Sequence, residues 1–284
     1  METRPISLPF SDPHAALTAY LPEGGAKAAI LILPGGGYQL CAEVEGAPVA
    51  ARFAALDYAA LVLRYSTLDC GAEHTVFPAP LREVALAVAF IRSHAAELRL
   101  ESPFVAVCGA SAGGHLAACY GSCWNTPAVF RGIAEPETLR PDACVLLYAV
   151  TELTNAFTMM ANAIYGQPGF FEREELERWS VLNLLGEQSA PTVLFHSAPD
   201  PAVPMTQSME LFAALQGLGI ASELHIFGSG EHAYGPGTGT QAEIWPDLAD
   251  RFLTALRTEP DRFDMAKMRA VRAERHRREQ EGRA

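Results

Sequence analysis

Short, nearly continuous apolar runs alternate along the chain with longer stretches in which apolar residues recur every three or four positions. Such runs, four to six residues long, are typical of strands that are buried on both faces of a sheet. They lie at residues 28–33, 59–63, 104–108, 144–148 and 192–195. A further run, 222–227, alternates apolar and polar residues, so we expect it nearer the edge of the sheet.

The stretches between these runs have the period of amphipathic helices. Residues 81–98 show it most clearly, and the same pattern predicts helices at 45–56, 113–123, 205–218 and 241–256. Buried strands separated by helices indicate an α/β fold, with a mostly parallel sheet and helices on both faces. The alternating segments ISLPF and ALTAYLP near the N-terminus predict one or two antiparallel edge strands.

Two regions lack this rhythm. About forty residues, 151–190, contain no clear strand, and long insertions of this kind are often lids or binding loops. Extra helices packed on the core are the alternative, and both descriptions can hold. From residue 264 the chain carries seven basic and four acidic residues with few apolar ones. We therefore expect one α/β catalytic domain at 1–263, with a lid-like helical insertion at about 151–190. A charged helix or tail should follow at 264–284.

Composition and charge narrow the class of protein. A chain of 284 residues that is 49% hydrophobic can bury one large core. Its formal net charge of −12 disfavours nucleic acid and anionic membranes as partners, because most of the surface would repel phosphates. No apolar run approaches the roughly 20 residues that span a bilayer, and no signal-peptide pattern is present. We expect a cytoplasmic protein, and a homo-oligomer stays open.

The six cysteines do not suggest a metal or a disulfide framework. Cys119 and Cys123 are four residues apart on an expected helix, but no second pair of ligands accompanies them. Reduced thiols in a cytosolic protein are the simpler interpretation. We expect neither a metal nor an organic cofactor.

The segment GASAGG follows the apolar run 104–108 directly. It places Ser111 between a buried strand and a helix, which is the context of a nucleophile elbow. The flanking glycines fit a strained turn where strand and helix crowd together. The same small residues would also serve an ordinary tight turn, so Ser111 needs partners elsewhere in the chain.

Two later loops supply these partners in the order that this architecture requires. Asp200 follows the run 192–195, and His232 follows the run 222–227 in a glycine-rich loop. A serine hydroxyl needs a base, and the base needs an orienting carboxylate. Ser111, Asp200 and His232 each stand at the carboxyl end of an expected strand, where sites of open α/β sheets lie.

Other residues compete for the same roles. Glu152 is the alternative acid, because some hydrolases use the position after the preceding strand. His196, His115 and His225 are alternative bases, though each also fits a structural position. Glu231 is expected to be a solvated or structural acid rather than a catalytic one.

A third loop, PGGGY, follows the run 28–33. Its glycines allow positive φ and close approach to backbone amides, so the loop suits either a phosphate or an oxyanion. It lacks the lysine and the hydroxyl residue of a phosphate-binding P-loop. A tight turn without function is also compatible with these letters.

Together these segments resemble an α/β-hydrolase fold esterase of the acetyl-esterase, acetylxylan-esterase-like group, related to the hormone-sensitive-lipase-type carboxylesterases. The resembling pieces are LPGGGY, EGAPVA, LVLRYS, GASAGGHLAA, RPDACVLLY, FHSAPDPAVP and ELHIFGSGEHAYG. The resemblance implies that Ser111 is the nucleophile, Asp200 the acid and His232 the base. It also implies an oxyanion hole made of the amides of Gly36, Gly37 and Ala112. Many relatives have a histidine before the three glycines, where this chain has Pro34.

The resemblance predicts hydrolysis of a small-molecule ester with a small, acetyl-like acyl group, such as that of an acetylated sugar or oligosaccharide. Tyr38 and Tyr234 are candidates to contact the substrate, or simply pack. The alternatives are another triad hydrolase of this fold, such as an arylformamidase or a peptidase-like enzyme, and a catalytically silent binding protein.

Overall fold

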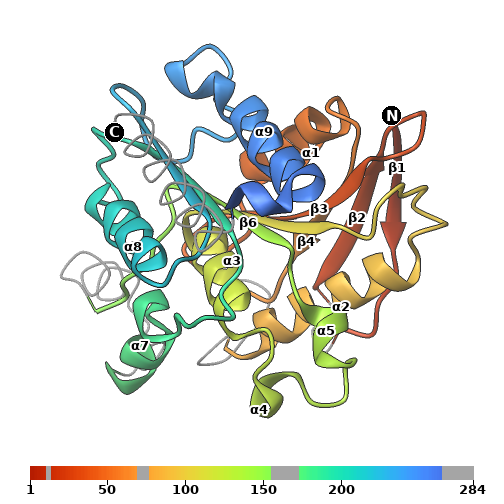
Figure 1. Ribbon diagram of the computed structural model, residues 1–284, viewed down its shortest axis with the longest axis horizontal. Coiled ribbons are helices and arrows are strands. Elements are labelled where there is room, and N and C mark those ends of the chain that lie inside the picture. The colour runs from red at the N-terminus through yellow and green to blue at the C-terminus, as the bar shows by residue number, and fades with distance from the viewer. Residues whose placement is uncertain (11–13, 69–76, 155–172, 264–284) are drawn as a thin grey trace, which may run out of the picture.

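The protein is described by a computed structural model that defines residues 1–10, 14–68, 77–154 and 173–263. Within these residues one twisted eight-stranded sheet runs through the molecule, with helices on both of its faces (Figure 1). The strand order is β1-β2-β4-β3-β5-β6-β7-β8. Strands β1 and β2 are antiparallel to their neighbours, and all other pairs are parallel. This is the expected α/β fold with antiparallel edge strands at its N-terminal side.

The strands follow the apolar runs closely. Their bounds are β1 Glu2–Ile6, β2 Ala16–Leu21, β3 Ala28–Leu33, β4 Tyr58–Arg64, β5 Val105–Ala110, β6 Ala143–Leu147, β7 Thr192–Ser197 and β8 Ser222–Phe227. Every residue of β3, β5, β6 and β7 is buried, which explains why their sequences do not alternate. The pleat nevertheless sorts the side chains, since Ile30 belongs to one core layer and Leu31 to the other.

The helices divide between the two faces. Their bounds are α1 Ala47–Ala54, α2 Ala79–Ser93, α3 Ser111–Cys123, α4 Pro127–Phe130, α5 Pro136–Leu139, α7 Arg173–Trp179, α8 Thr206–Gly217 and α9 Trp245–Thr258. Helices α1 and α9 cover one face, where Phe53 and Trp245 pack against each other. Helices α2, α3 and α8 cover the other face through residues such as Leu81, Leu116 and Leu211. Short 3-10 turns lie at Glu43–Glu45, Val181–Asn183, Gln241–Ile244 and Pro260–Phe263.

Three elements differ from the predicted bounds by more than two residues. The first edge strand lies at Glu2–Ile6 rather than within ISLPF, because residues 2–6 pair with 17–21. The helix expected at 241–256 is split into a 3-10 turn and α9, with Pro246 in the first turn of α9. Helix α2 ends at Ser93 rather than Leu98. The short helices α4 and α5, each four residues long, are too brief to give a period.

The expected insertion at 151–190 is described only at its two ends. Residues 173–190 contain α7 and a 3-10 turn, and Leu176, Trp179 and Val181 are buried in the core. The aromatic and methionine residues Phe157, Met159, Met160, Phe170 and Phe171 of this insertion lie outside the described residues, as does the tail 264–284. Closure of this insertion over a ligand stays a prediction.

The buried cysteines Cys108, Cys119, Cys123 and Cys144 are free thiols. Among the described residues, no helix combines the length and the apolar composition needed to cross a bilayer. In the same part of the chain, no group of three His, Cys, Asp or Glu side chains converges as a metal site.

Candidate active site

Ser111 stands on a strained turn between β5 and α3. The strand ends at Ala110 and the helix begins at Ser111, whose φ of 52° lies in the left-handed region that non-glycine residues rarely adopt. Tight packing forces this geometry. A Cβ on Gly109 would lie 2.1 Å from the carbonyl oxygen of Gly113, and a Cβ on Gly113 would lie 2.0 Å from that of Leu33. The glycines of GASAGG are therefore required sterically, as expected for a nucleophile elbow.

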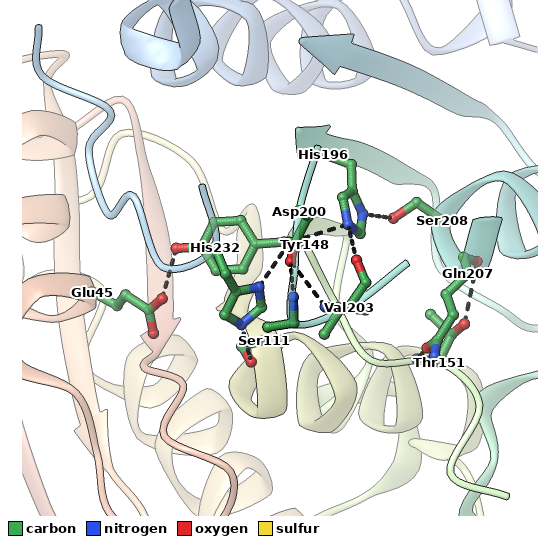
Figure 2. Close-up of polar contacts among 11 residues, drawn as sticks. Glu45, Ser111, Tyr148, Thr151, His196, Asp200, Val203, Gln207, Ser208 and His232 are labelled. Carbon is green, nitrogen blue, oxygen red and sulfur yellow. Dashed lines mark hydrogen bonds and ion pairs between the residues drawn. The ribbon is translucent and has the colours of Figure 1, made fainter. Parts of the chain in front are cut away.

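The structure brings the three predicted residues into one hydrogen-bonded chain (Figure 2). Nε2 of His232 lies 2.8 Å from Oγ of Ser111, and Nδ1 of His232 lies 2.8 Å from Oδ2 of Asp200. A carboxylate only accepts, so Nδ1 carries the ring proton and leaves Nε2 to accept from the serine hydroxyl. This tautomer is the one in which a histidine can take a proton from a nucleophile.

Asp200 is held in its ionised form by its loop. Its Oδ1 accepts hydrogen bonds from the backbone N–H groups of Ala202 at 2.8 Å and Val203 at 2.9 Å. Burial alone would raise the pKa of Asp200, but hydrogen bonds from His196, His232 and the Val203 amide together lower it below its usual range. The carboxylate thus stays charged at neutral pH and can stabilise an imidazolium at His232.

The glycine loop after β3 lies directly against the serine. A Cβ on Gly35 would be 2.9 Å from Cβ of Ser111. Gly36 and Gly37 have φ values of 126° and 63°, and a Cβ on Gly36 would lie 2.1 Å from the carbonyl oxygen of Leu40. Ala112 is in the first turn of α3, where backbone N–H groups lack helical partners. The predicted oxyanion donors, Gly36, Gly37 and Ala112, therefore belong to the two segments that flank Ser111; their role stays a prediction.

Helix α3 supports the glycine loop through a buried histidine. The hydroxyl of Tyr38 donates to Nδ1 of His115 at 2.5 Å, and Nε2 of His115 donates to the carbonyl of Trp179 at 2.8 Å. Burial lowers the pKa of His115 to about 4, although the Trp179 carbonyl and the charge of Glu152 oppose the shift. His115 is thus neutral near pH 7 and acts as a fixed hydrogen-bonding link.

This link bears on two sequence predictions. Tyr38 is only 3% exposed and packs against Tyr65 and Phe77, which favours packing over the predicted contact with substrate. The carbonyl of Pro34, at the start of the loop, accepts from the hydroxyl of Tyr65 at 2.6 Å. Tyrosine hydroxyls therefore hold the loop from its two ends.

Tyr234, the other predicted substrate contact, lines an open hollow of about 790 Å³ beside His232. Pro199, Pro201 and Glu231 line the same hollow, and Glu231 is exposed as expected. The hydroxyl of Tyr234 is buried and has no hydrogen-bond partner among the described residues. Contact with substrate stays a prediction for this residue.

The rival residues occupy other positions. Oε1 of Glu152 accepts hydrogen bonds from Thr154 and Ser180, while the acid beside His232 is Asp200. His225 pairs with Glu223 across 3.4 Å on β8. His115 is buried in the link to Tyr38, and His196 lies behind Asp200 rather than beside Ser111.

Two residues that the sequence reasoning did not single out also contact the site. Glu45 bonds to the glycine loop, and the ring of Tyr148 packs edge-on against that of His232 with centroids 4.8 Å apart (Figure 2). In the sequence, Glu45 is simply the acidic residue that begins EGAPVA. Tyr148 looks like the last residue of a buried strand, so neither position carries a local signal.

Comparison with known families agrees with this architecture. The model of the BD-FAE family matches residues 17–215, which is well over half of the chain. The chain belongs to the BD-FAE family. The segment matched to BD-FAE contains the glycine loop, Ser111 and Asp200, while His232 lies beyond its end.

Two relatives of this BD-FAE protein are esterases, each at low identity. Esterase LipQ of Mycobacterium tuberculosis is 28% identical over 212 residues, covering 70% of this chain and 48% of LipQ. An acetylxylan esterase of Xylanibacter ruminicola is 26% identical over 232 residues, covering 80% of this chain and 45% of that protein. The chain thus spans about half the length of these two relatives.

A solved structure resembles the whole fold. The carboxylesterase Cest-2923 of Lactobacillus plantarum superposes with a TM-score of 0.74 at 26% identity, covering 89% of this chain and 96% of that one. The likeness identifies the fold as that of the α/β hydrolases. The predicted family and fold class are therefore confirmed.

Proposed function

We propose that the protein is a serine carboxylesterase that hydrolyses esters with small acyl groups, with acetylated sugars or oligosaccharides as the substrate class. The observation that carries the proposal is the unbroken chain of hydrogen bonds from Ser111 through His232 to Asp200, on an elbow that faces a glycine loop. The esterase relatives support ester hydrolysis. The acetylxylan esterase among them supports the acetyl group and the sugar.

In the first half of the reaction, Oγ of Ser111 attacks the ester carbonyl carbon as Nε2 of His232 takes the hydroxyl proton. Asp200 holds the imidazole and stabilises its positive charge. The carbonyl oxygen becomes an oxyanion that accepts hydrogen bonds from the amides of Gly36, Gly37 and Ala112. When the tetrahedral intermediate collapses, His232 protonates the leaving alcohol, and the acyl group stays on Ser111.

In the second half, water attacks the acyl-enzyme. His232 takes a proton from the water, the oxyanion hole again holds the negative charge, and Ser111 leaves with the proton returned from His232. The products are the carboxylic acid and the free enzyme. Every proton moves through His232, so one base serves both halves of the reaction.

An acyl-chain series tests the substrate class. We expect kcat/KM to be highest for 4-nitrophenyl acetate and to fall through the butyrate to the octanoate, with acetate also released from acetylated xylose and xylo-oligosaccharides. Ser111→Ala, assayed on each substrate, is the matched control. A preference for the longest chain would overturn the small-acyl assignment. Turnover of N-formylkynurenine or of a peptide in preference to every ester would favour another triad hydrolase.

A further inference from the structure

Glu45 is a buried carboxylate that the proposed reaction leaves without a role. It ends the 3-10 turn Glu43–Glu45 and is 2% exposed. An ionised carboxylate inside a protein is costly unless hydrogen bonds satisfy it. Both of its oxygens are satisfied here, and the two donors come from different parts of the active site.

The first oxygen fixes the glycine loop. Oε2 of Glu45 accepts from the backbone N–H of Gly35 at 2.6 Å. Gly35 is the residue whose Cα faces Cβ of Ser111, and it immediately precedes the two predicted oxyanion donors. A charge-assisted hydrogen bond of this length is among the stronger polar contacts in a protein. This hydrogen bond therefore fixes the orientation of the Gly35 peptide group, which directly precedes the predicted oxyanion donors Gly36 and Gly37.

The second oxygen reaches the histidine loop. Oε1 of Glu45 accepts from the hydroxyl of Tyr148 at 2.7 Å, and the same hydroxyl accepts from the backbone N–H of Gly235 at 3.2 Å. Gly235 is three residues beyond His232, and the Tyr148 ring packs edge-on against the imidazole. In Figure 2, Glu45 lies on the side of His232 opposite His196, and the hydroxyl of Tyr148 points toward it. Glu45 thus links the loops that follow β3 and β6 and, through Tyr148, the loop that follows β8.

We propose that Glu45 is a positioning residue that holds the glycine loop and, through Tyr148, the histidine loop in one common geometry. The inference rests on the proposed ester hydrolysis. In that reaction the oxyanion donors and the base must face the same carbonyl group, and a misplacement of about 1 Å can cost about a hundredfold in rate. The two bonds of Glu45 set the distance between these groups without contacting the substrate.

The test uses Glu45→Gln and Tyr148→Phe in the full chain. Glutamine keeps the volume and one acceptor, but offers an N–H group where the second acceptor stood. Phenylalanine keeps the ring against His232 and the bond to Gly35, but removes the link to Gly235. Glu43→Gln is the matched control, because Glu43 lies on the same 3-10 turn and is exposed. We measure kcat and KM for 4-nitrophenyl acetate, the rate of labelling by a fluorophosphonate, and Tm.

At an assay temperature well below the Tm of each variant, we expect kcat to fall about tenfold to a hundredfold. KM should stay within about twofold of wild type. The labelling rate should fall in parallel, and Glu43→Gln should match wild type. The double variant should be little slower than the worse single one, because both act on one path. If Glu45→Gln does not fold, Tyr148→Phe alone decides.

Folded variants with wild-type kcat and labelling rate would overturn the inference and leave the esterase assignment intact, as would a fall in Tm alone. Losses that multiply in the double variant would overturn the path through Tyr148. If the wild-type protein shows no ester hydrolysis that depends on Ser111, the proposed function is overturned, and this inference with it.

Discussion

Nε2 of His196 lies 3.4 Å from Oδ2 of Asp200, the same oxygen that receives the hydrogen bond from His232. The His196 ring is completely buried, and its Nε2 also lies 2.9 Å from the carbonyl oxygen of Val203. Both partners only accept, so Nε2 carries a proton, while Nδ1 pairs with the hydroxyl of Ser208 at 2.8 Å. His196 therefore braces the carboxylate from behind and is not aimed at Ser111.

His196→Gln should slow the enzyme only modestly, by about tenfold in kcat, because the two backbone amides and His232 still hold Asp200. His232→Gln should cost about a thousandfold or more, because the reaction loses its base. The measurement is kcat for 4-nitrophenyl acetate in both variants, each checked for folding by circular dichroism. Equal losses in the two would return His196 to consideration as the base.

Asp200→Asn should keep the fold and lower kcat by about a thousandfold or more, because an amide can donate to Nδ1 and so favours the wrong imidazole tautomer. Its remaining oxygen can still accept from the amides of Ala202 and Val203. The matched control is Glu152→Gln, which changes the rival acid. Near-normal turnover in Asp200→Asn combined with an inactive Glu152→Gln would show that the acid is Glu152 and not Asp200.

Gly113→Ala should destabilise the protein by at least about 2 kcal/mol, because the added methyl would meet the backbone carbonyl oxygens of Leu33 and Pro34 at 2.0 and 2.4 Å. Backbone atoms of the central sheet cannot move aside cheaply. Gly217→Ala, at the end of α8, has open space around the new methyl and should change stability by no more than about 1 kcal/mol, in the favourable direction. Urea denaturation of both variants measures the difference; similar stabilities would contradict the packing of the elbow.

His115 should make the fold acid-sensitive. Its pKa is lowered from 6.5 to about 4 by burial, so below pH 6.5 the unfolded chain takes up a proton that the folded chain resists. Stability from this group is full above pH 6.5 and falls as the pH drops toward 4, by up to roughly 3 kcal/mol. His115→Asn, less stable than wild type at pH 7, should show a shallower fall between pH 6.5 and 4. Parallel curves of unfolding free energy against pH would contradict this origin.

The sheet was largely predictable because its strands are buried on both faces. Strands β3, β5, β6 and β7 read as uninterrupted apolar runs, and helices between them leave few alternatives to a parallel sheet. The edge was less predictable, since no residue of β1 is fully buried and its register depends on pairing with β2. The end of β6 was also hard to predict. Tyr148 continues the apolar run, but its φ of 36° turns the chain out of β6 toward the site.

The candidate site was predictable where one residue type must follow one strand. Ser111, Asp200 and His232 each lie in a recognisable motif after a strand, and the structure brings them within hydrogen-bonding distance. The supporting contacts were not predictable in this way. Glu45 and Tyr148 are 103 residues apart, and Tyr38 and His115 are 77 apart, so their pairing exists only in the folded chain. Burial of Tyr38 likewise depends on neighbours that its own segment does not contain.

The most direct test of the account is covalent labelling of the nucleophile. Wild-type protein is incubated with a fluorophosphonate at pH 7.5 and analysed by intact mass and peptide mapping, beside Ser111→Ala and an exposed-serine control, Ser93→Ala. We predict one phosphonyl group per chain, located on Ser111, in wild type and in Ser93→Ala, none in Ser111→Ala, and loss of ester hydrolysis in step with labelling. An unlabelled Ser111 in an actively hydrolysing protein, or wild-type turnover by Ser111→Ala, would contradict the account.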